Sequence, residues 1–297
     1  GCAEASHVGR PSVWQVLADK PNVKDVACGE EHTLVLLDTG QVFSWGCGRN
    51  GRLGLEDIFD RTPACHVEAL DGIEIEAVSC GVSHSLAICS KGTCFAWGKN
   101  TRGQCGDTDN VSSDVSPCTR TVGRSTSRTS EANDPVLPQS CNLPSPLVMI
   151  AGGREHSLAL TRCGALFSFG GGSKSSGDIP PVLGISATAD AASTEVMLGK
   201  NGGVSPMRVC GDALGTASVK TIASGWDHCL AVTNDGELFT WGSGRDGQLG
   251  HGDREPRYAP TLVAFSSTSA GGRVRSVAGG RSYSAAVTAE GRVLKWG

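Results

Sequence analysis

The segment Val26–Leu36, VACGEEHTLVL, decides the fold because the chain repeats it. Its features are a glycine, a histidine three residues later and an apolar run after the histidine. Further copies begin at Val78, Ile150, Ile222 and Val277. The glycine in each copy serves as a marker, and the markers are Gly29, Gly81, Gly153, Gly225 and Gly280, separated by 52, 72, 72 and 55 residues. Such internal repetition indicates an array built from one supersecondary unit.

Each copy continues through a glycine turn into a second apolar run that ends in an aromatic residue and glycine. These runs are Gln41–Gly46, Thr93–Gly98, Ala165–Gly170, Glu237–Gly242 and Arg292–Gly297. In the first copy, Thr33–Leu37 and Val42–Trp45 flank the turn at Asp38–Gly40, which predicts an antiparallel hairpin. Val23–Ala27 and Pro63–Leu70 predict two more strands. Four short strands repeated head to tail are typical of propeller blades.

The repeat resembles that of the regulator of chromosome condensation family. The shared elements are V-x-x-G-x-x-H-[ST]-L-A-[LV], then G-x-[VL]-[FY]-x-W-G, then N-x-x-G-Q-L-G. The resemblance implies a β-propeller, usually of seven blades. We therefore expect an all-β chain that forms a β-propeller of four-stranded blades, with about five blades present as part of a seven-bladed ring.

We expect residues 1–297 to form a single β-propeller domain or a fragment of one. The predicted units lie near 23–75, 76–147, 148–219, 220–274 and 275–297, and a strand at 11–17 is expected to complete a neighbouring blade. The chain lacks an initiator methionine and stops inside the repeat motif, so we expect a fragment without about two blades. Insertions near 107–146 and 171–217 lack helical periodicity, which predicts surface loops. Partner binding, regulatory phosphorylation and no role at all remain open for them.

The stretch Trp241–Gly250, WGSGRDGQLG, contains the G-x-G-x-x-G pattern of phosphate-binding loops. That pattern is informative only between a strand and a helix. The corresponding stretch Trp45–Gly54 also fits it, whereas Trp97–Gly106 lacks the second glycine, and no helical pattern follows any of them. We therefore predict a turn between strands.

The repeated histidines, His32, His84, His156 and His228, invite comparison with a metal site. The fifth copy has Tyr283 in this place, and no acidic residue recurs at a fixed offset. We predict a structural role, with the histidines satisfying backbone groups, and expect no metal, cofactor or catalytic residues. The thirteen cysteines include no C-x-x-C pair, which favours reduced structural thiols. The repeated aromatic residues are expected to pack between blades.

Trp226 stands in a variable position, directly after the marker glycine. The other copies have Glu30, Val82, Arg154 and Arg281 there. Trp226 beside Asp227 is either a contact residue for a partner or a buried packing residue. Turn positions supply the candidate partner-binding residues, which are Trp226, Asp227, Arg245 and Asp246.

The bulk properties restrict the function. The net charge of −4 without long blocks of one sign argues against nucleic acid or anionic lipid as the main partner. No apolar run approaches the ~18 residues of a membrane span. We expect an intracellular monomer, cytoplasmic or nuclear, that acts as a protein–protein interaction scaffold. The alternative implied by the resemblance is guanine-nucleotide exchange on a small Ran-like GTPase. Neither hydrolase nor oxidoreductase motifs are present.

Overall fold

The computed structural model describes residues 22–106, 137–141, 143–144, 146–171, 181–184, 206–209, 214, 217–265 and 272–297. Strands dominate these ranges. The helical elements described are the 3₁₀ turns η1 (Arg49–Gly51), η2 (Glu68–Leu70) and η3 (Pro181–Leu183). None of these short turns could span a bilayer.

The strands form five antiparallel sheets, each built from one copy of the repeat. The first sheet contains β1 (Val23–Cys28), β2 (His32–Leu37), β3 (Val42–Gly46) and β4 (Arg61–His66); the second contains β5 (Ile75–Cys80), β6 (His84–Cys89), β7 (Cys94–Gly98) and β8 (Gln139–Ser140); the third contains β9 (Leu147–Gly152), β10 (His156–Thr161), β11 (Leu166–Gly170) and β12 (Met207–Arg208). The fourth contains β13 (Val219–Ser224), β14 (His228–Thr233), β15 (Leu238–Gly242) and β16 (Arg257–Leu262), and the fifth contains β17 (Val274–Gly279), β18 (Ser284–Thr288) and β19 (Val293–Trp296). These sheets are the predicted blades, so the all-β propeller prediction is confirmed.

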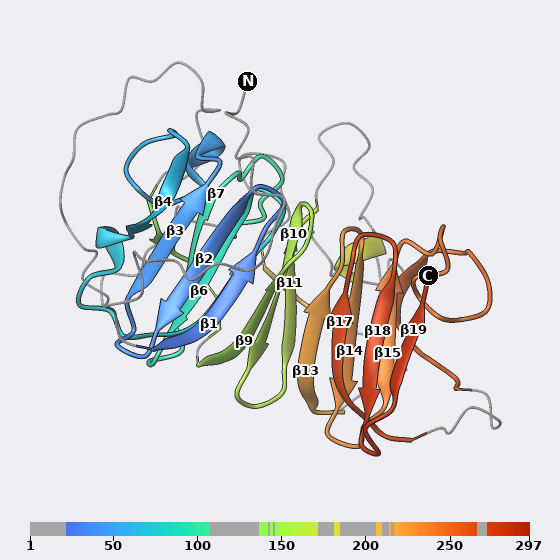
Figure 1. Ribbon diagram of the computed structural model, residues 1–297. Coiled ribbons are helices and arrows are strands. Elements are labelled where there is room, and N and C mark those ends of the chain that lie inside the picture. Colours follow the sequence, from blue (N-terminus) through green and yellow to red (C-terminus); the bar gives the residue numbers. More distant parts are fainter. Residues whose placement is uncertain are drawn as a thin grey trace, which may run out of the picture.

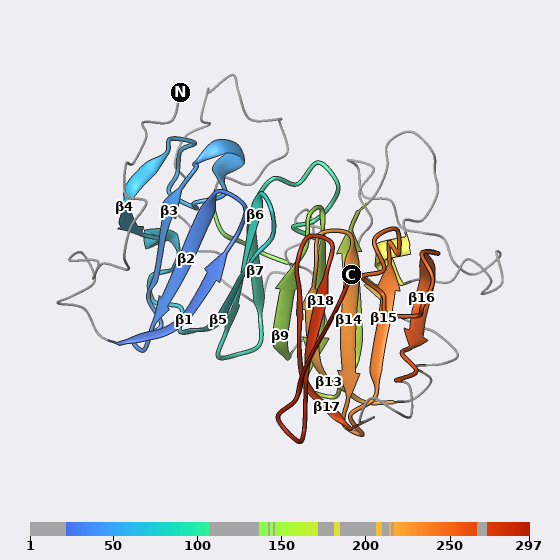
Figure 2. The ribbon, with the colours of Figure 1, turned by 45° about the vertical axis from the view of Figure 1, so that its right-hand side comes forward.

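The blades follow one another along an arc, from β1–β4 to β17–β19 (Figures 1 and 2). The first strands of neighbouring blades contact each other, and the first strand of each blade after the first also packs on the second strand of the preceding blade. Each interface encloses an apolar cluster; Leu34 and Leu36 of the first blade, for example, meet Val78 and Trp97 of the second. The blades are thus held mainly by packing between sheets.

Some boundaries differ from the sequence prediction. The fourth strand of the first blade starts at Arg61, and Glu68–Leu70 is a 3₁₀ turn, whereas we predicted one strand over Pro63–Leu70. The predicted insertions at 107–146 and 171–217 contain the short fourth strands β8 and β12. Much of both insertions, and the predicted strand at 11–17, lie outside the described residues. Blade boundaries, and the size of a complete ring, stay predictions.

A recurring set of hydrogen bonds links each blade to the next. At the first junction, the hydroxyl of Ser85 donates to the carbonyl oxygen of Arg52 at 2.7 Å and lies 3.0 Å from Nε2 of His32. Because this hydroxyl uses its proton on the carbonyl, we infer that His32 Nε2–H donates to Ser85. The indole Nε1–H of Trp97 donates to the same carbonyl at 3.0 Å. One buried carbonyl therefore organises two side chains of the next blade.

The other junctions repeat this arrangement with small changes. His84 reaches Ser157 at 2.8 Å and His228 reaches Ser284 at 2.8 Å. At the third junction Cys229 replaces the serine, and His156 Nε2 lies 3.2 Å from its sulfur and 2.6 Å from the hydroxyl of Ser224. The histidines are structural, as predicted, but their Nε2 partners are side chains of the next blade rather than local backbone groups.

The marker glycines are explained by these histidines. A Cβ on Gly81 would lie 2.0 Å from Cε1 of His84, so only glycine lets the imidazole lie against the backbone. At the three junctions with a tryptophan, a second glycine, after the organising carbonyl, is restricted by that tryptophan. A Cβ on Gly54, Gly184 or Gly250 would lie within 3.0 Å of the Nε1 atom of Trp97, Trp241 or Trp296. Val182–Gly184, which lies within the predicted insertion at 171–217, therefore occupies the same turn position in the third blade.

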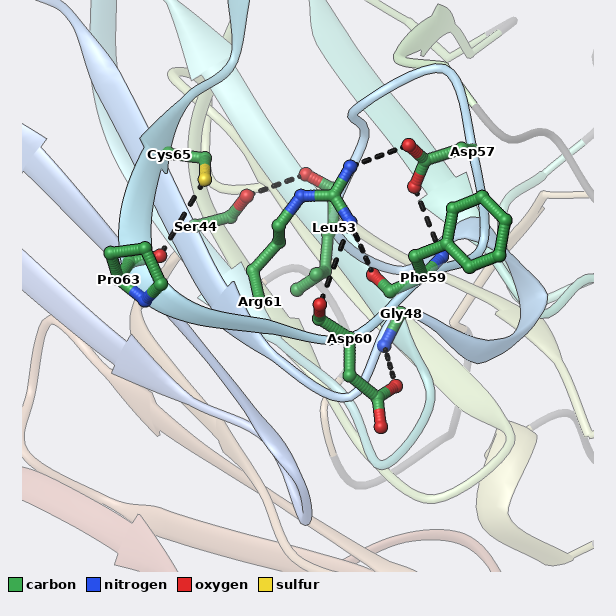
Figure 3. Close-up of polar contacts among 9 residues, drawn as sticks. All are labelled: Ser44, Gly48, Leu53, Asp57, Phe59, Asp60, Arg61, Pro63 and Cys65. Carbon is green, nitrogen blue, oxygen red and sulfur yellow. Dashed lines mark hydrogen bonds and ion pairs between the residues drawn. The ribbon is translucent and has the colours of Figure 1, made fainter. Parts of the chain in front are cut away.

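The loop before the fourth strand is also repeated. Figure 3 shows Arg61 pairing with Asp57 while its Nη1–H donates to the carbonyl of Phe59 at 3.2 Å, and Asp57 accepts the Phe59 backbone N–H at 3.0 Å. Arg257, Asp253 and Glu255 make the same three contacts in the fourth blade. The Trp241–Gly250 stretch precedes this loop and leads to strand β16 rather than a helix, so the turn prediction is confirmed.

The second junction offers a test of the shared carbonyl. Ser157→Ala is expected to lower the free energy of unfolding by about 1–3 kcal/mol, and by more than Ser85→Ala, in urea titrations. The reason is that Phe169 replaces tryptophan at this junction. Ser157 is the side-chain donor that the structure gives to the Gln104 carbonyl, and Ser157→Ala removes it. In Ser85→Ala, Trp97 still donates to Arg52. Equal losses in the two variants would contradict this account.

The buried histidines predict acid sensitivity. Burial lowers the pKa of His32, His84 and His156 to about 3 and that of His228 to about 4. The unfolded chain binds these protons below pH ~6.5, whereas the folded chain does not until pH approaches 3 to 4. The free energy of unfolding should therefore fall as pH drops from 6.5 to 4. His84→Gln, which keeps an N–H for Ser157, should reduce that slope by about 1.4 kcal/mol per pH unit; an unchanged slope would refute the assignment.

Candidate functional site

One end of the propeller gathers the turns that follow the marker glycines. In the first blade His32 pairs with Gly46, so the turn before β2 and the loop after β3 share this end. The loop is tied to the turn by the Cys47 N–H, which donates to the Glu31 carbonyl at 2.7 Å, and Ser243 does the same with Asp227 at 2.8 Å. We call the residues directly after the marker glycines, namely Glu30, Val82, Arg154, Trp226 and Arg281, the turn row.

The turn row is continuous from the second blade to the fifth. The backbone N–H of Val82 donates to the Gly153 carbonyl at 3.0 Å. Arg154 donates to Trp226 at 3.0 Å, and Trp226 donates to Gly280 at 3.1 Å. These bonds cross from blade to blade, so residues more than fifty positions apart in sequence become direct neighbours.

Trp226 lies between two arginines of the same row. The guanidinium carbon of Arg281 is 4.2 Å from the centre of a Trp226 ring, and that of Arg154 is 5.5 Å away. The indole is half-buried, whereas both arginines are exposed. Cations over an indole face are attracted by its quadrupole, which fixes the ring orientation. Trp226 is therefore neither a core residue nor a freely rotating surface residue.

Carboxylates lie beside the arginines. Asp227 Oδ2 is 3.7 Å from Arg154 Nη1, and both side chains are about half exposed, at 52% and 47%. Burial raises the pKa of Asp227, and the charges of Arg154 and Arg245 oppose that rise only in part. A loose, half-exposed pair of this kind contributes little to stability, so both groups are available to a partner.

Glu155, next to Arg154, is held more tightly. Its carboxylate pairs with Lys99 at 2.9 Å and Arg102 at 3.6 Å, which joins the second blade to the third. Burial raises the pKa of Glu155, but the Lys99 hydrogen bond and the nearby cations outweigh it and lower the pKa overall. This network supports the turn of Arg154.

The candidate residues of the sequence analysis are only partly brought together. Trp226 and Asp227 are adjacent in one turn, and the positive charge of Arg245 opposes the rise that burial causes in the pKa of Asp227. Asp246 is exposed on the same loop, but its clear contact is a backbone N–H bonded to Gln248 at 2.9 Å. Arg154 and Arg281 were missed as site residues, although the alignment of the repeats already placed them in the Trp226 position. Within the described ranges, no group of three His, Cys, Asp or Glu side chains is arranged to hold a metal.

Comparison with known proteins identifies the family. A model of the regulator of chromosome condensation (RCC1) repeat matches residues 39–88, 91–160 and 235–287, and a second model of this repeat matches 23–52, 75–104 and 219–248. The chain therefore belongs to the regulator of chromosome condensation repeat family.

Similar proteins within this family differ in activity. The Arabidopsis thaliana ultraviolet-B receptor UVR8 is 30% identical over 292 residues, which cover 97% of this chain and 56% of the receptor. The human probable E3 ubiquitin-protein ligase HERC6 is 34% identical over 240 residues, covering 80% of this chain and 20% of the ligase. This chain thus spans about half or less of these relatives.

Solved structures agree on the fold. Prp20p from Saccharomyces cerevisiae, reported with its binding to Gsp1p and histones, superposes with a TM-score of 0.68 at 23% identity. The match covers 90% of this chain and 56% of Prp20p. Human WBSCR16 also gives a TM-score of 0.68 at 23% identity, over 91% of this chain and 58% of its own. The family supports a role in protein interaction or nucleotide exchange without specifying which.

The turn row should be dispensable for folding. Trp226→Ala is expected to lower the free energy of unfolding by about 1 kcal/mol or less, since a partly exposed cation–π contact is lost. Trp241→Ala, which empties a fully buried site between blades, should cost about 3–5 kcal/mol. Urea unfolding followed by circular dichroism measures both; similar losses would show that Trp226 is a packing residue.

Proposed function

We propose that this chain is a protein–protein interaction module that binds its partner through the end of the propeller that carries the turn row. The observation that supports the proposal is the stack of Arg154, Trp226 and Arg281. Tryptophan and arginine are enriched among residues that contribute most to binding, particularly where they are held in place before binding. Here backbone hydrogen bonds and cation–π contacts hold three such residues on successive blades.

Asp227 and Arg245 extend this proposed surface. Both side chains are exposed, and the positive charge of Arg245 opposes the rise that burial causes in the pKa of Asp227. Charged groups at the rim of an interface direct association and select partners more than they add affinity. Asp246 is included at the outer edge of the surface because it shares the loop of Arg245.

Site-specific photo-crosslinking in cells tests this proposal. A photoreactive amino acid at position 226 of the full-length protein is expected to capture a defined partner, identified by mass spectrometry. The same amino acid at position 235, in the hairpin turn at the opposite end of the fourth blade, is the matched control. Equal capture at both positions, or capture at 235 alone, would contradict binding by the turn row.

Guanine-nucleotide exchange on a small Ran-like GTPase is the alternative, and family membership is what favours it. Its test is the release of a fluorescent GDP analogue from a Ran-type GTPase in the presence of the full-length protein. We expect no acceleration for a binding module. Acceleration by about a hundredfold or more, lost in Asp227→Ala, would replace our proposal by an exchange activity that uses the same surface, since loss of one essential contact costs several kcal/mol.

A further inference from the structure

The charges along the turn row change sign from one side of the arc to the other. The first blade has the exposed carboxylate of Glu30 in the row, and the neighbouring Glu31 pairs with Arg52 at 3.4 Å. The second blade has Val82 in the row, and the third and fifth blades have arginines. Because the first strands of neighbouring blades pack on one another from the first blade to the fifth, this polarity is built into the fold.

Cations also exceed anions around Trp226. Arg281 has no acidic partner within ion-pair distance among the described residues, and it covers one face of the indole at 4.2 Å. Arg154 pairs with Asp227 over a distance of 3.7 Å, and Arg245, whose charge also acts on the Asp227 carboxyl, is exposed. An incoming carboxylate could replace the weak Arg154–Asp227 pair at little cost, because half-exposed pairs contribute little.

From this arrangement, and resting on the proposed function, we infer that the turn row binds an acidic, flexible segment of a partner protein across the third to fifth blades. Carboxylates of that segment pair with Arg154 and Arg281, and its apolar atoms pack on the edge of Trp226. Glu30 repels the segment from the first blade. Charge complementarity thus sets both the partner class and the position where the segment lies.

A polypeptide fits this surface better than a nucleic acid does. Asp227 and Glu155 lie among the arginines, and the whole chain carries a net charge of −4. Nucleic-acid binding depends on uninterrupted contact between many cations and a regular phosphate backbone. Side chains of an acidic peptide are unevenly spaced and flexible, so they can reach the arginines while avoiding the two carboxylates.

The test uses three capped probes of equal length: octa-glutamate, octa-lysine and an eight-nucleotide thymidine strand. Binding to the full-length protein is measured by isothermal titration calorimetry at low ionic strength and by tryptophan emission, with Trp226→Phe identifying the emission of Trp226. We expect octa-glutamate to bind and to change the Trp226 emission. Arg281→Glu should weaken this binding about tenfold or more, as expected for reversal of a contacting charge.

Arg292→Glu is the matched control, because it makes the same change of charge at the opposite end of the same blade. It should leave octa-glutamate binding within about twofold, a difference well below the ~1.4 kcal/mol of a tenfold change. Absent octa-glutamate binding, equal losses in both variants, or tighter binding of octa-lysine or of the thymidine strand would each overturn the inference. If position 226 still crosslinks to a partner in cells, the interaction proposal survives such a result and only the acidic chemistry is wrong.

Discussion

The structure depends on one buried backbone carbonyl at each of the four junctions between described blades. In each loop after the third strand, this carbonyl receives a hydroxyl or thiol proton from the next blade, and in most junctions an indole proton as well. At three junctions the same hydroxyl also binds a histidine of the preceding blade, and at the third junction the Cys229 sulfur takes its place. A buried acceptor without a partner costs more than the bond itself contributes. A shift of one blade against the next would leave these carbonyls unpaired, so the hydrogen bonds select the registration at which the apolar faces pack.

That registration produces the candidate site. Once the histidines lie against the marker glycines, the residue that follows each glycine emerges at the same end of the propeller. Interblade backbone bonds then place Arg154, Trp226 and Arg281 side by side. None of the three belongs to a core cluster, so their identities can change while the fold is kept. The framework is thus repeated, and the surface that it presents is specific to this chain.

The repeats made the fold predictable, since apolar alternation and turn glycines encode each hairpin locally. Prediction was poorer where structure depends on pairing alone. Strands β8 and β12 have two residues each and no pattern of their own, and the turn at Val182–Gly184 is separated from its motif by an intervening segment. Aligning the repeats singled out Trp226, and turn positions suggested Asp227, Arg245 and Asp246. It missed Arg154 and Arg281 as parts of the site because their approach to the indole arises from the stacking of blades, which no local pattern records.

The third junction shows that neighbouring blades are matched to each other. Cys229 occupies the position that serine holds elsewhere, and Ser224, in the small-residue position before the marker glycine, adds a hydroxyl to His156. Cys229 and Ser224 of the fourth blade therefore both contact one histidine of the third blade, His156. Neighbouring blades are thus matched to each other, so a blade moved to another place in the series would lack the side chains that its new neighbour requires. The side chains at each junction therefore restrict which blade can follow which.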